Sequence, residues 1–178
     1  MNTSIARPLR TTLVLAALVA TGLATAPAAG AEPTCGGEAA TIADSAGVII
    51  GTNGDDVIIG DNGANTIDGK GGHDLICGRG GDDEIYGGTG NDQIDGGGDD
   101  DVIEAGKGAD YVYGGLGDDT IAGQAGADEL RGGLGDDTIA GGNGDDLLVG
   151  DSGTDTLICG PGDDFNTQEG NGSLLFPC

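Results

Sequence analysis

The chain repeats nearly the same nine residues from Gly51 to Ile158 without an insertion, and this periodicity restricts its fold more than any other feature. The first blocks read GTNGDDVII, GDNGANTID, GKGGHDLIC, GRGGDDEIY and GGTGNDQID, and twelve blocks follow one another in phase. With position 1 set at Gly51, position 4 is Gly in every block except the sixth, which carries Asp99. A fixed short period predicts a solenoid of stacked units rather than an ordinary globular domain.

Two columns of the repeat carry opposite chemistry. Position 8 is aliphatic in all twelve blocks: Ile58, Ile67, Ile76, Ile85, Ile94, Ile103, Val112, Ile121, Leu130, Ile139, Leu148 and Leu157. Position 6 is acidic in every block but the second, and a thirteenth block, CGPGDDFNT, keeps the acid. The candidate metal ligands are therefore Asp56, Asn65, Asp74, Asp83, Asp92, Asp101, Asp110, Asp119, Asp128, Asp137, Asp146, Asp155 and Asp164.

Each block predicts a turn followed by a strand. Glycines at positions 1 and 4, often with a third at position 2, permit positive φ and close backbone approach. Positions 7 to 9 predict a very short strand with one inward side chain. Because one block buries nothing alone, two blocks must form a coil that stacks on its neighbours. The fold class predicted is all-β, a parallel β-roll (β-solenoid) with two nonapeptides per coil.

The ends of the array predict caps for the exposed edges of the solenoid. We assign residues 32–50 to an N-terminal cap, 51–158 to twelve nonapeptide repeats and 159–178 to a C-terminal cap with a degenerate repeat. Ile49 lies in the position-8 phase without the glycines, which predicts a strand that binds no metal. Asn166 replaces the aliphatic residue of the thirteenth block, so we expect a turn there and no core strand.

The first 31 residues resemble an export signal. Arg7 and Arg10 precede an apolar run from Thr12 to Ala26, and small residues follow at Ala29 to Ala31. The run is shorter than the roughly 20 residues that a membrane-spanning helix needs, so no membrane span is expected. Without this segment, four basic residues face 31 acidic ones, a formal net charge of -27. Such a chain does not bind nucleic acid or an anionic membrane by itself, whereas it does attract cations.

Four cysteines, Cys35, Cys77, Cys159 and Cys178, predict two disulfides in an exported chain. Three pairings are compatible with the sequence. We favour Cys35 with Cys77 and Cys159 with Cys178, because each pair ties one end of the array to its nearest neighbour. A zinc site is disfavoured, since the chain has no Cys-x-x-Cys spacing and a single His.

The blocks GGTGNDQID (Gly87 to Asp95) and GGLGDDTIA (Gly114 to Ala122 and Gly132 to Ala140) resemble the repeats-in-toxin (RTX, hemolysin-type) calcium-binding nonapeptide. This resemblance implies a right-handed parallel β-roll with Ca²⁺ between the turns of successive coils on the same side. It also implies ligands from position-6 carboxylates and from turn carbonyls such as those of Gly87, Thr89 and Asn91. The chain is further similar to small stand-alone secreted calcium-binding proteins of actinobacteria.

Oxygen ligands from carboxylates and carbonyls suit Ca²⁺ better than Mg²⁺ or a transition metal. With a metal between neighbouring turns on both sides, we expect up to about ten calcium ions and a fold that depends on them. Asn65 predicts a weaker site than its acidic counterparts. The protein is expected to be monomeric, secreted and extracellular.

No catalytic motif accompanies the repeats. His73 occupies position 5 of its turn, where other blocks carry Asp, Asn, Ala or Thr, and predicts a solvated turn residue. Neither Gly-x-Ser-x-Gly nor His-Glu-x-x-His occurs, so we expect no enzyme. Two functions stay open: a calcium-binding protein that buffers calcium or bridges cell surface and matrix, and a calcium-dependent carbohydrate-binding, adhesive or enzyme-accessory module. The second would use Tyr86, Tyr111, Tyr113 and Arg131, which form no continuous stripe in the repeat.

Overall fold

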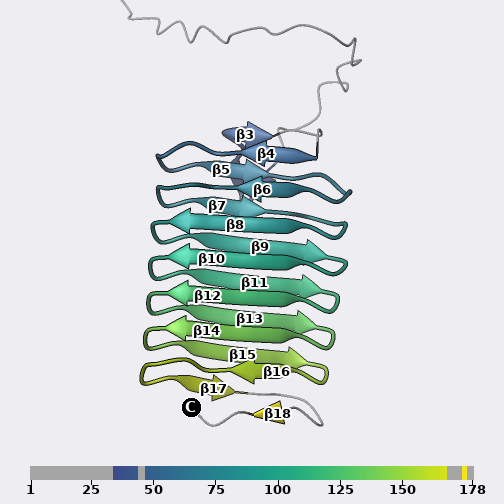
Figure 1. Cartoon of the computed structure of the whole chain (residues 1–178). Coiled ribbons are helices and arrows are strands. Elements are labelled where there is room, and N and C mark those ends of the chain that lie inside the picture. The colour runs from purple at the N-terminus through teal and green to yellow at the C-terminus, as the bar shows by residue number, and fades with distance from the viewer. Residues whose placement is uncertain (1–33, 44–46, 168–173, 176–178) are drawn as a thin grey trace, which may run out of the picture. The chain divides into compact units, whose positions relative to one another are not determined.

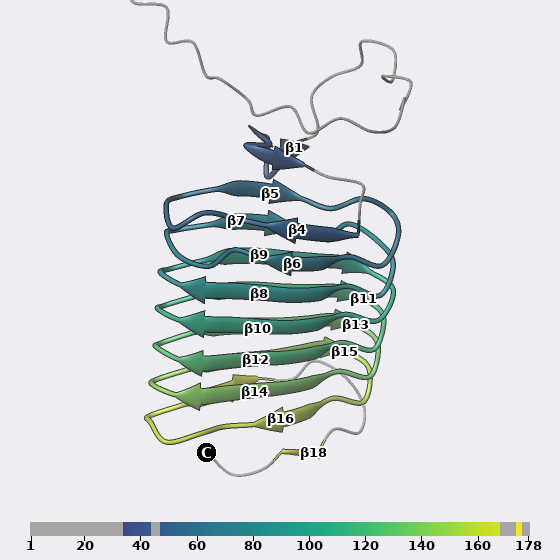
Figure 2. The same ribbon diagram turned by 45° about the horizontal axis from the view of Figure 1, so that its top comes forward.

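The computed structural model describes residues 34–43, 47–167 and 174–175. The predicted export segment and Cys178 lie outside these residues. The described part of the chain consists of strands and turns. Most of the strands belong to two sheets, each built from parallel strands (Figures 1 and 2). A short antiparallel hairpin, β1 (Thr34–Cys35) and β2 (Glu38–Ala39), precedes the sheets.

The odd sheet contains the odd-numbered strands from β3 to β17, in sequence order. They are β3 (Ile42–Ala43), β5 (Val57–Ile59), β7 (Leu75–Cys77), β9 (Gln93–Gly98), β11 (Tyr111–Leu116), β13 (Glu129–Leu134), β15 (Leu147–Ser152) and β17 (Phe165–Thr167). The even sheet contains β4 (Val48–Ile50), β6 (Thr66–Asp68), β8 (Glu84–Thr89), β10 (Val102–Lys107), β12 (Thr120–Ala125), β14 (Thr138–Asn143), β16 (Thr156–Ile158) and β18 (Leu174–Leu175).

The register between neighbouring strands of the repeat array is 18 residues. Ile103 pairs with Ile85 on one side and with Ile121 on the other, and both pairings are parallel. Successive blocks therefore alternate between the two sheets, and two nonapeptides complete one coil. The predicted all-β parallel β-roll is confirmed.

The core lies between the two sheets and consists of the position-8 side chains. All twelve are at most 2% exposed, and Ile49 continues the same column into β4, which confirms it as a core strand. Ala105, at position 1 of its block, is also fully buried. Position 1 is thus a second inward position, which the prediction of one inward side chain per block overlooked. Each buried position-8 side chain contributes about 2 kcal/mol to folding.

The strands in the middle of the roll are longer than predicted. β8 to β15 each span six residues, because positions 1 to 3 of the following block join the ladder after positions 7 to 9. Gly88, for example, pairs with Gly106. A Cβ on Gly106 would lie 2.2 Å from the Gly88 carbonyl oxygen, so a glycine column lets these backbones approach.

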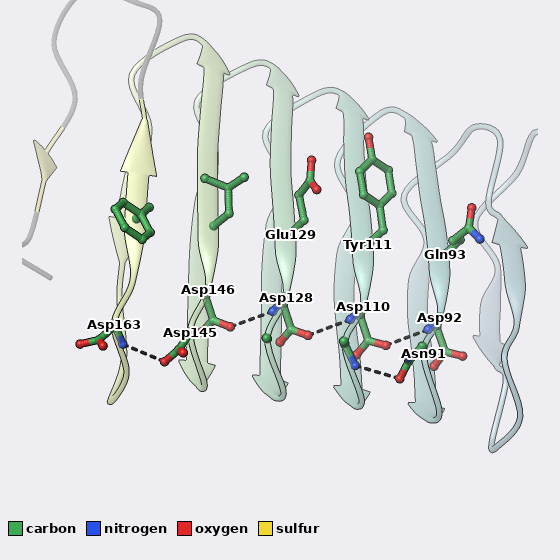
Figure 3. A pocket seen from close by; sticks show the side chains of 14 residues that line it. Asn91, Asp92, Gln93, Asp110, Tyr111, Asp128, Glu129, Asp145, Asp146 and Asp163 are labelled. Atoms are coloured by element: carbon green, nitrogen blue, oxygen red, sulfur yellow. Dashed lines mark hydrogen bonds between the residues drawn. The ribbon is translucent and has the colours of Figure 1, made fainter.

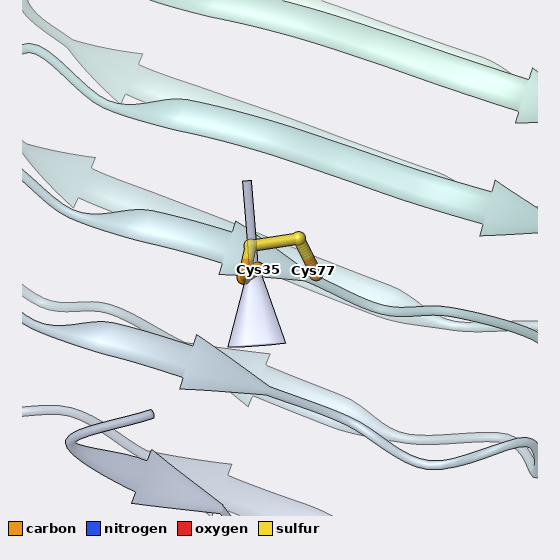
Figure 4. Close-up of a disulfide and its surroundings, with 2 residues drawn as sticks. All are labelled: Cys35 and Cys77. Carbon is orange, nitrogen blue, oxygen red and sulfur yellow. A yellow bond between two sulfur atoms is a disulfide. The ribbon is translucent and has the colours of Figure 1, made fainter. Parts of the chain in front are cut away.

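The two ends of the roll differ in how they match the predictions. The thirteenth block forms a short strand, β17, which pairs with β15, whereas the prediction was of a turn and no core strand there. Asn166 at its centre is only half-buried, however, and does not extend the core. At the other end Cys35 is bonded to Cys77, as predicted, and joins the hairpin to β7 (Figure 4). The second predicted pairing falls on Cys178, outside the described residues.

Candidate metal centre

Each edge of the roll carries one turn per coil, and each turn ends in its position-6 residue. We call the turns that lead into odd strands the odd edge and those that lead into even strands the even edge. Figure 3 shows Asp92, Asp110, Asp128 and Asp146 in a row along the odd edge. The position-6 aspartates from Asp74 to Asp155 are all at most 3% exposed. The structure therefore gathers the predicted residues into two buried rows.

One oxygen of each buried carboxylate is part of a ladder between coils. The backbone N–H of Asp92 donates to Oδ1 of Asp110 at 2.8 Å, and that of Asp110 donates to Oδ1 of Asp128 at 2.9 Å (Figure 3). The same bond recurs along the odd edge up to Asp164 and along the even edge from Asn65 to Asp155. The Oδ1 atoms of this ladder thus link neighbouring coils by hydrogen bonds.

The other oxygen has no hydrogen-bond donor in nine consecutive blocks. These oxygens are Oδ2 of Asp74, Asp83, Asp92, Asp101, Asp110, Asp119, Asp128, Asp137 and Asp146. A buried acceptor without a partner costs about 1–3 kcal/mol, and more when it is charged. Nine such oxygens recur at the same position of the repeat. The residues present therefore fit a bound cation, which would be the missing partner of each oxygen.

At position 1, glycine leaves space for the second carboxylate oxygen of its own block, although Ala105 takes this position before Asp110. A Cβ on Gly96 would come within 2.5 Å of Oδ2 of Asp101, and the same contact recurs in the blocks on both edges. Position 1 uses the close backbone approach that glycine permits, and its φ is not positive in these turns. Positive φ occurs instead at positions 2 and 4, as at Gly88 (108°) and Gly90 (131°), in every turn from 69–74 to 150–155.

Four turns adopt this conformation at position 2 with a side chain other than glycine. These residues are Lys70, Arg79, Gln124 and Asp151, with φ between 62° and 87°. Asp99 replaces glycine at position 4 and also has positive φ, 71°, a conformation that strains a residue with a side chain. The turn shape is thus imposed by stacking and not by glycine alone.

The electrostatics of the rows favour a cation. Burial raises the pKa of Asp74, Asp83, Asp110, Asp119 and Asp128 to about 6, and backbone N–H donors lower it only in part. The pKa of Asp101 and of Asp137 rises to about 7, because burial is reinforced by the neighbouring carboxylates of the stack. A bound cation would oppose both causes, since it compensates desolvation and repulsion at once.

Side chains alone do not complete a metal site. Among the described residues, no three or more His, Cys, Asp or Glu side chains converge on one point. Any cation held at the position-6 row must therefore take further ligands from the backbone carbonyls of the turns. Such a set of oxygens is the kind that Ca²⁺ accepts.

Position 5 forms a second ladder that sequence reasoning missed. The N–H of His73 donates to Oδ1 of Asp55 at 2.8 Å, and the N–H of Asn91 donates to Nδ1 of His73 at 2.8 Å. Asp118 likewise accepts from the N–H of Asp136. This ladder runs opposite to that of position 6. His73 is exposed, as predicted, and its ring accepts a backbone hydrogen bond, as the exposed carboxylate of Asp55 also does.

The acceptor-rich composition of position 5 was the available signal for this ladder. Most blocks carry Asp, Asn, His or Thr there, and the ladder lapses on the odd edge at the blocks that carry Ala109 and Ala127. The exposed position-5 side chains hold the tips of the turns, while the buried position-6 side chains remain available for a ligand.

The sequence profile of the RTX calcium-binding nonapeptide repeat (4 copies) matches residues 44–76, 78–112, 95–130, 105–139, 122–157 and 131–165. The chain therefore belongs to the RTX calcium-binding nonapeptide repeat family. No curated protein matches the chain. In the described part of the chain, no helix is long and apolar enough to cross a membrane.

Proposed function

We propose that the protein is a secreted calcium-binding β-roll whose middle coils fold when several Ca²⁺ ions bind between stacked turns. The observation that carries this proposal is the run of nine buried Oδ2 atoms without a donor. Their carboxylates would hold the ions from one side, and carbonyl oxygens of the turns, such as those of Gly87, Thr89 and Asn91, would complete the shells. The ion itself supplies positive charge and no redox or acid–base chemistry.

The protein's own residues position the ligands. The Oδ1 ladder fixes each carboxylate on its neighbour, so Oδ2 of Asp110 and of Asp128 cannot both turn to water without breaking hydrogen bonds between coils. In most blocks glycine at position 1 leaves room for that oxygen, and Ala105 takes this place in the block of Asp110. The site is therefore pre-arranged once the coils are stacked. Without bound cations, burial and repulsion of the carboxylates would destabilise this stack.

The size of the calcium effect suits folding on binding. A site held at ten times its dissociation constant contributes about 1.4 kcal/mol, so several sites together approach the stability of a whole domain. Extracellular calcium modules have dissociation constants of about 0.1–1 mM. A chain of this kind would fold outside the cell, where calcium is abundant. The Cys35–Cys77 disulfide supports an oxidising compartment, as the export signal predicted.

The test is a calcium titration of the chelated protein in which bound ions and far-UV circular dichroism are followed together. We expect several ions per chain and a β-sheet signal that rises in parallel with occupancy. A magnesium titration at equal concentration is the control, and we expect it to give a much weaker response. Full β-sheet signal in excess chelator would contradict folding on binding, and absence of bound calcium would contradict the site.

A second candidate function, calcium-dependent carbohydrate binding, is favoured by one surface. A groove of about 680 Å³ runs beside the row of aspartates on the odd edge (Figure 3). Its lining includes Gln93, Tyr111, Glu129 and Phe165 on neighbouring odd strands. Tyr111 is 41% and Phe165 is 72% exposed, and exposed aromatic rings beside hydrogen-bonding groups suit the apolar and polar sides of sugar rings.

A glycan array with the calcium-loaded protein would test this candidate. Specific binding that is lost in Tyr111→Ala, with unchanged calcium binding, would place a saccharide in the groove. A matched control is Tyr86→Ala, which alters a tyrosine on the even sheet. No retained glycan, or equal effects of both variants, would exclude the groove as a saccharide site.

A further inference from the structure

Two turns on the odd edge have almost the same sequence and opposite structures. Residues 51–56 read GTNGDD and residues 141–146 read GGNGDD, so they differ only at position 2, where one has Thr52 and the other Gly142. Both turns lie on the same edge, and both end in a position-6 aspartate. The pair therefore shows two turn forms that nearly the same sequence adopts at different places in the roll.

The turn 141–146 has the form described above. Gly142 and Gly144 have φ of 107° and 141°. Oδ1 of Asp146 accepts the N–H of Asp128 at 2.9 Å, and its Oδ2 is buried without a donor. This turn presents an unsatisfied oxygen to a cation.

The turn 51–56 is closed by its own residues. Neither Thr52 nor Gly54 has positive φ. Oδ2 of Asp56 accepts two hydrogen bonds from Thr52, one from the backbone N–H at 2.7 Å and one from the hydroxyl at 3.0 Å. A β-branched residue avoids positive φ, so Thr52 disfavours the other turn form and supplies the donors that fill the oxygen.

The second turn of this coil, 60–65, reaches the same result with different residues. Oδ1 of Asn65 accepts the N–H of Asp61 at 2.8 Å, and the amide of Asn65 donates back to Asp61 at 3.3 Å. The N–H of Gly63 also donates to Asp61, at 2.8 Å. Asn65 is uncharged, so the position-6 side chain of this turn offers neither a free oxygen nor a negative charge.

The thirteenth turn, 159–164, repeats the contact. The N–H of Gly160 donates to Oδ2 of Asp164 at 3.1 Å, and neither Gly160 nor Gly162 has positive φ. We call 51–56, 60–65 and 159–164 the terminal turns, and the turns from 69–74 to 150–155 the middle turns. In each terminal turn, the N–H of position 2 donates to the position-6 side chain.

We propose that the terminal turns bind no calcium through their position-6 residues, because hydrogen bonds from the position-2 residue occupy the side-chain oxygen that would coordinate a cation in the middle turns. Asp56, Asn65 and Asp164 then close the ends of the roll without metal, although the repeat pattern assigns them the same role as the others. This inference rests on the proposed calcium binding of the middle turns.

The test compares Asp56→Asn with Asp146→Asn in the full-length exported chain. Bound calcium is counted by equilibrium dialysis at saturation. We expect Asp56→Asn to retain the wild-type number of ions and Asp146→Asn to lose at least one. A loss in Asp56→Asn equal to that in Asp146→Asn would overturn the proposal. If the wild type binds no calcium, the proposed function fails instead, so the two failures are distinguishable.

A gain-of-site variant tests the role of Thr52 directly. Thr52→Gly makes residues 51–56 identical to 141–146, and we expect it to bind about one more ion than the wild type. Thr52→Ser keeps the hydroxyl without the β-branch and is expected to retain the wild-type number. An unchanged number of ions in Thr52→Gly, with circular dichroism in calcium equal to the wild type, would contradict the assignment to position 2.

Discussion

The N-terminal region, residues 34–68, and the middle region, residues 69–158, share one core but satisfy their polar groups differently. Ile49, Ile58 and Ile67 continue the same buried column as Ile103 and Ile121. The N-terminal region has three-residue strands, turns closed by their own side chains and a hairpin held by a disulfide. Most strands of the middle region have six residues, and nine of its position-6 carboxylates keep an oxygen without a donor.

This difference shows that the aliphatic column does not decide where the fold needs metal. The column stabilises both regions to a similar extent per coil, because each block buries one side chain of similar size. The difference lies in the position-6 side chains. In the N-terminal region their oxygens accept hydrogen bonds from their own turns, whereas nine carboxylates of the middle region keep an oxygen without a donor. If the middle coils fold on calcium binding as proposed, the N-terminal region would be the template on which they stack.

Removal of the disulfide is expected to have the largest effect on the difference in stability between the N-terminal and middle regions. Replacing Cys35 and Cys77 together by Ser removes a cross-link between residues 42 apart, which is worth on the order of 4 kcal/mol in the chain-entropy description. We expect hydrogen exchange to accelerate in β5 and to change little in β13 when calcium is saturating. Equal acceleration in both strands would show that the two regions do not differ in what holds them.

A smaller effect is expected from a methyl group at position 4. In Gly126→Ala the new Cβ would lie 1.4 Å from the Gly108 carbonyl oxygen at a φ of 147°, whereas in Gly54→Ala the nearest atom is 3.9 Å away. We expect Gly126→Ala to lower the free energy of unfolding in calcium by at least about 2 kcal/mol and Gly54→Ala to change it by less than about 1 kcal/mol. Urea denaturation measures both. Similar losses would contradict the two turn forms.

The smallest effect concerns pH in the absence of calcium. The pKa of Asp101 and of Asp137 is raised from 3.8 to about 7 in the folded chain, so the folded state binds protons more tightly than the unfolded state. Their contribution to stability is complete below the unfolded value and is lost as pH rises through about 7. We expect the chelated chain to show more β-sheet signal at pH 5 than at pH 8. An opposite trend in circular dichroism would contradict the buried, unpaired state of these carboxylates.

Much of the fold was predictable because it depends on period alone. The phase of Ile103 and Asp101 in the nonapeptide sufficed to place one in the core and the other at the end of a turn. The conformation of Lys70, Arg79, Gln124 and Asp151 was not predictable, since stacking on a coil 18 residues away imposes a φ that these residues rarely adopt.

The site was predictable in its residues but not in its hydrogen bonds. The division of each carboxylate into a bonded Oδ1 and a free Oδ2 depends on the neighbouring coil, which no single block reveals. The hydrogen bonds from Thr52 to Asp56 depend on the form of the turn. The position in the repeat does not reveal this form, so the sequence assigned Asp56 the same role as Asp146. The strand at Asn166 forms because β15 offers it a partner, whatever its side chain.

The central claim is that calcium orders the middle region and not the terminal turns, and region-resolved hydrogen exchange with and without calcium tests it most directly. With calcium, amides of β8 to β15 should be strongly protected. In excess chelator, we predict that these amides lose most of their protection, while β5, next to the hairpin and its disulfide, retains a larger share of its own. Protection of β8 to β15 that is the same in chelator and in calcium would contradict the account.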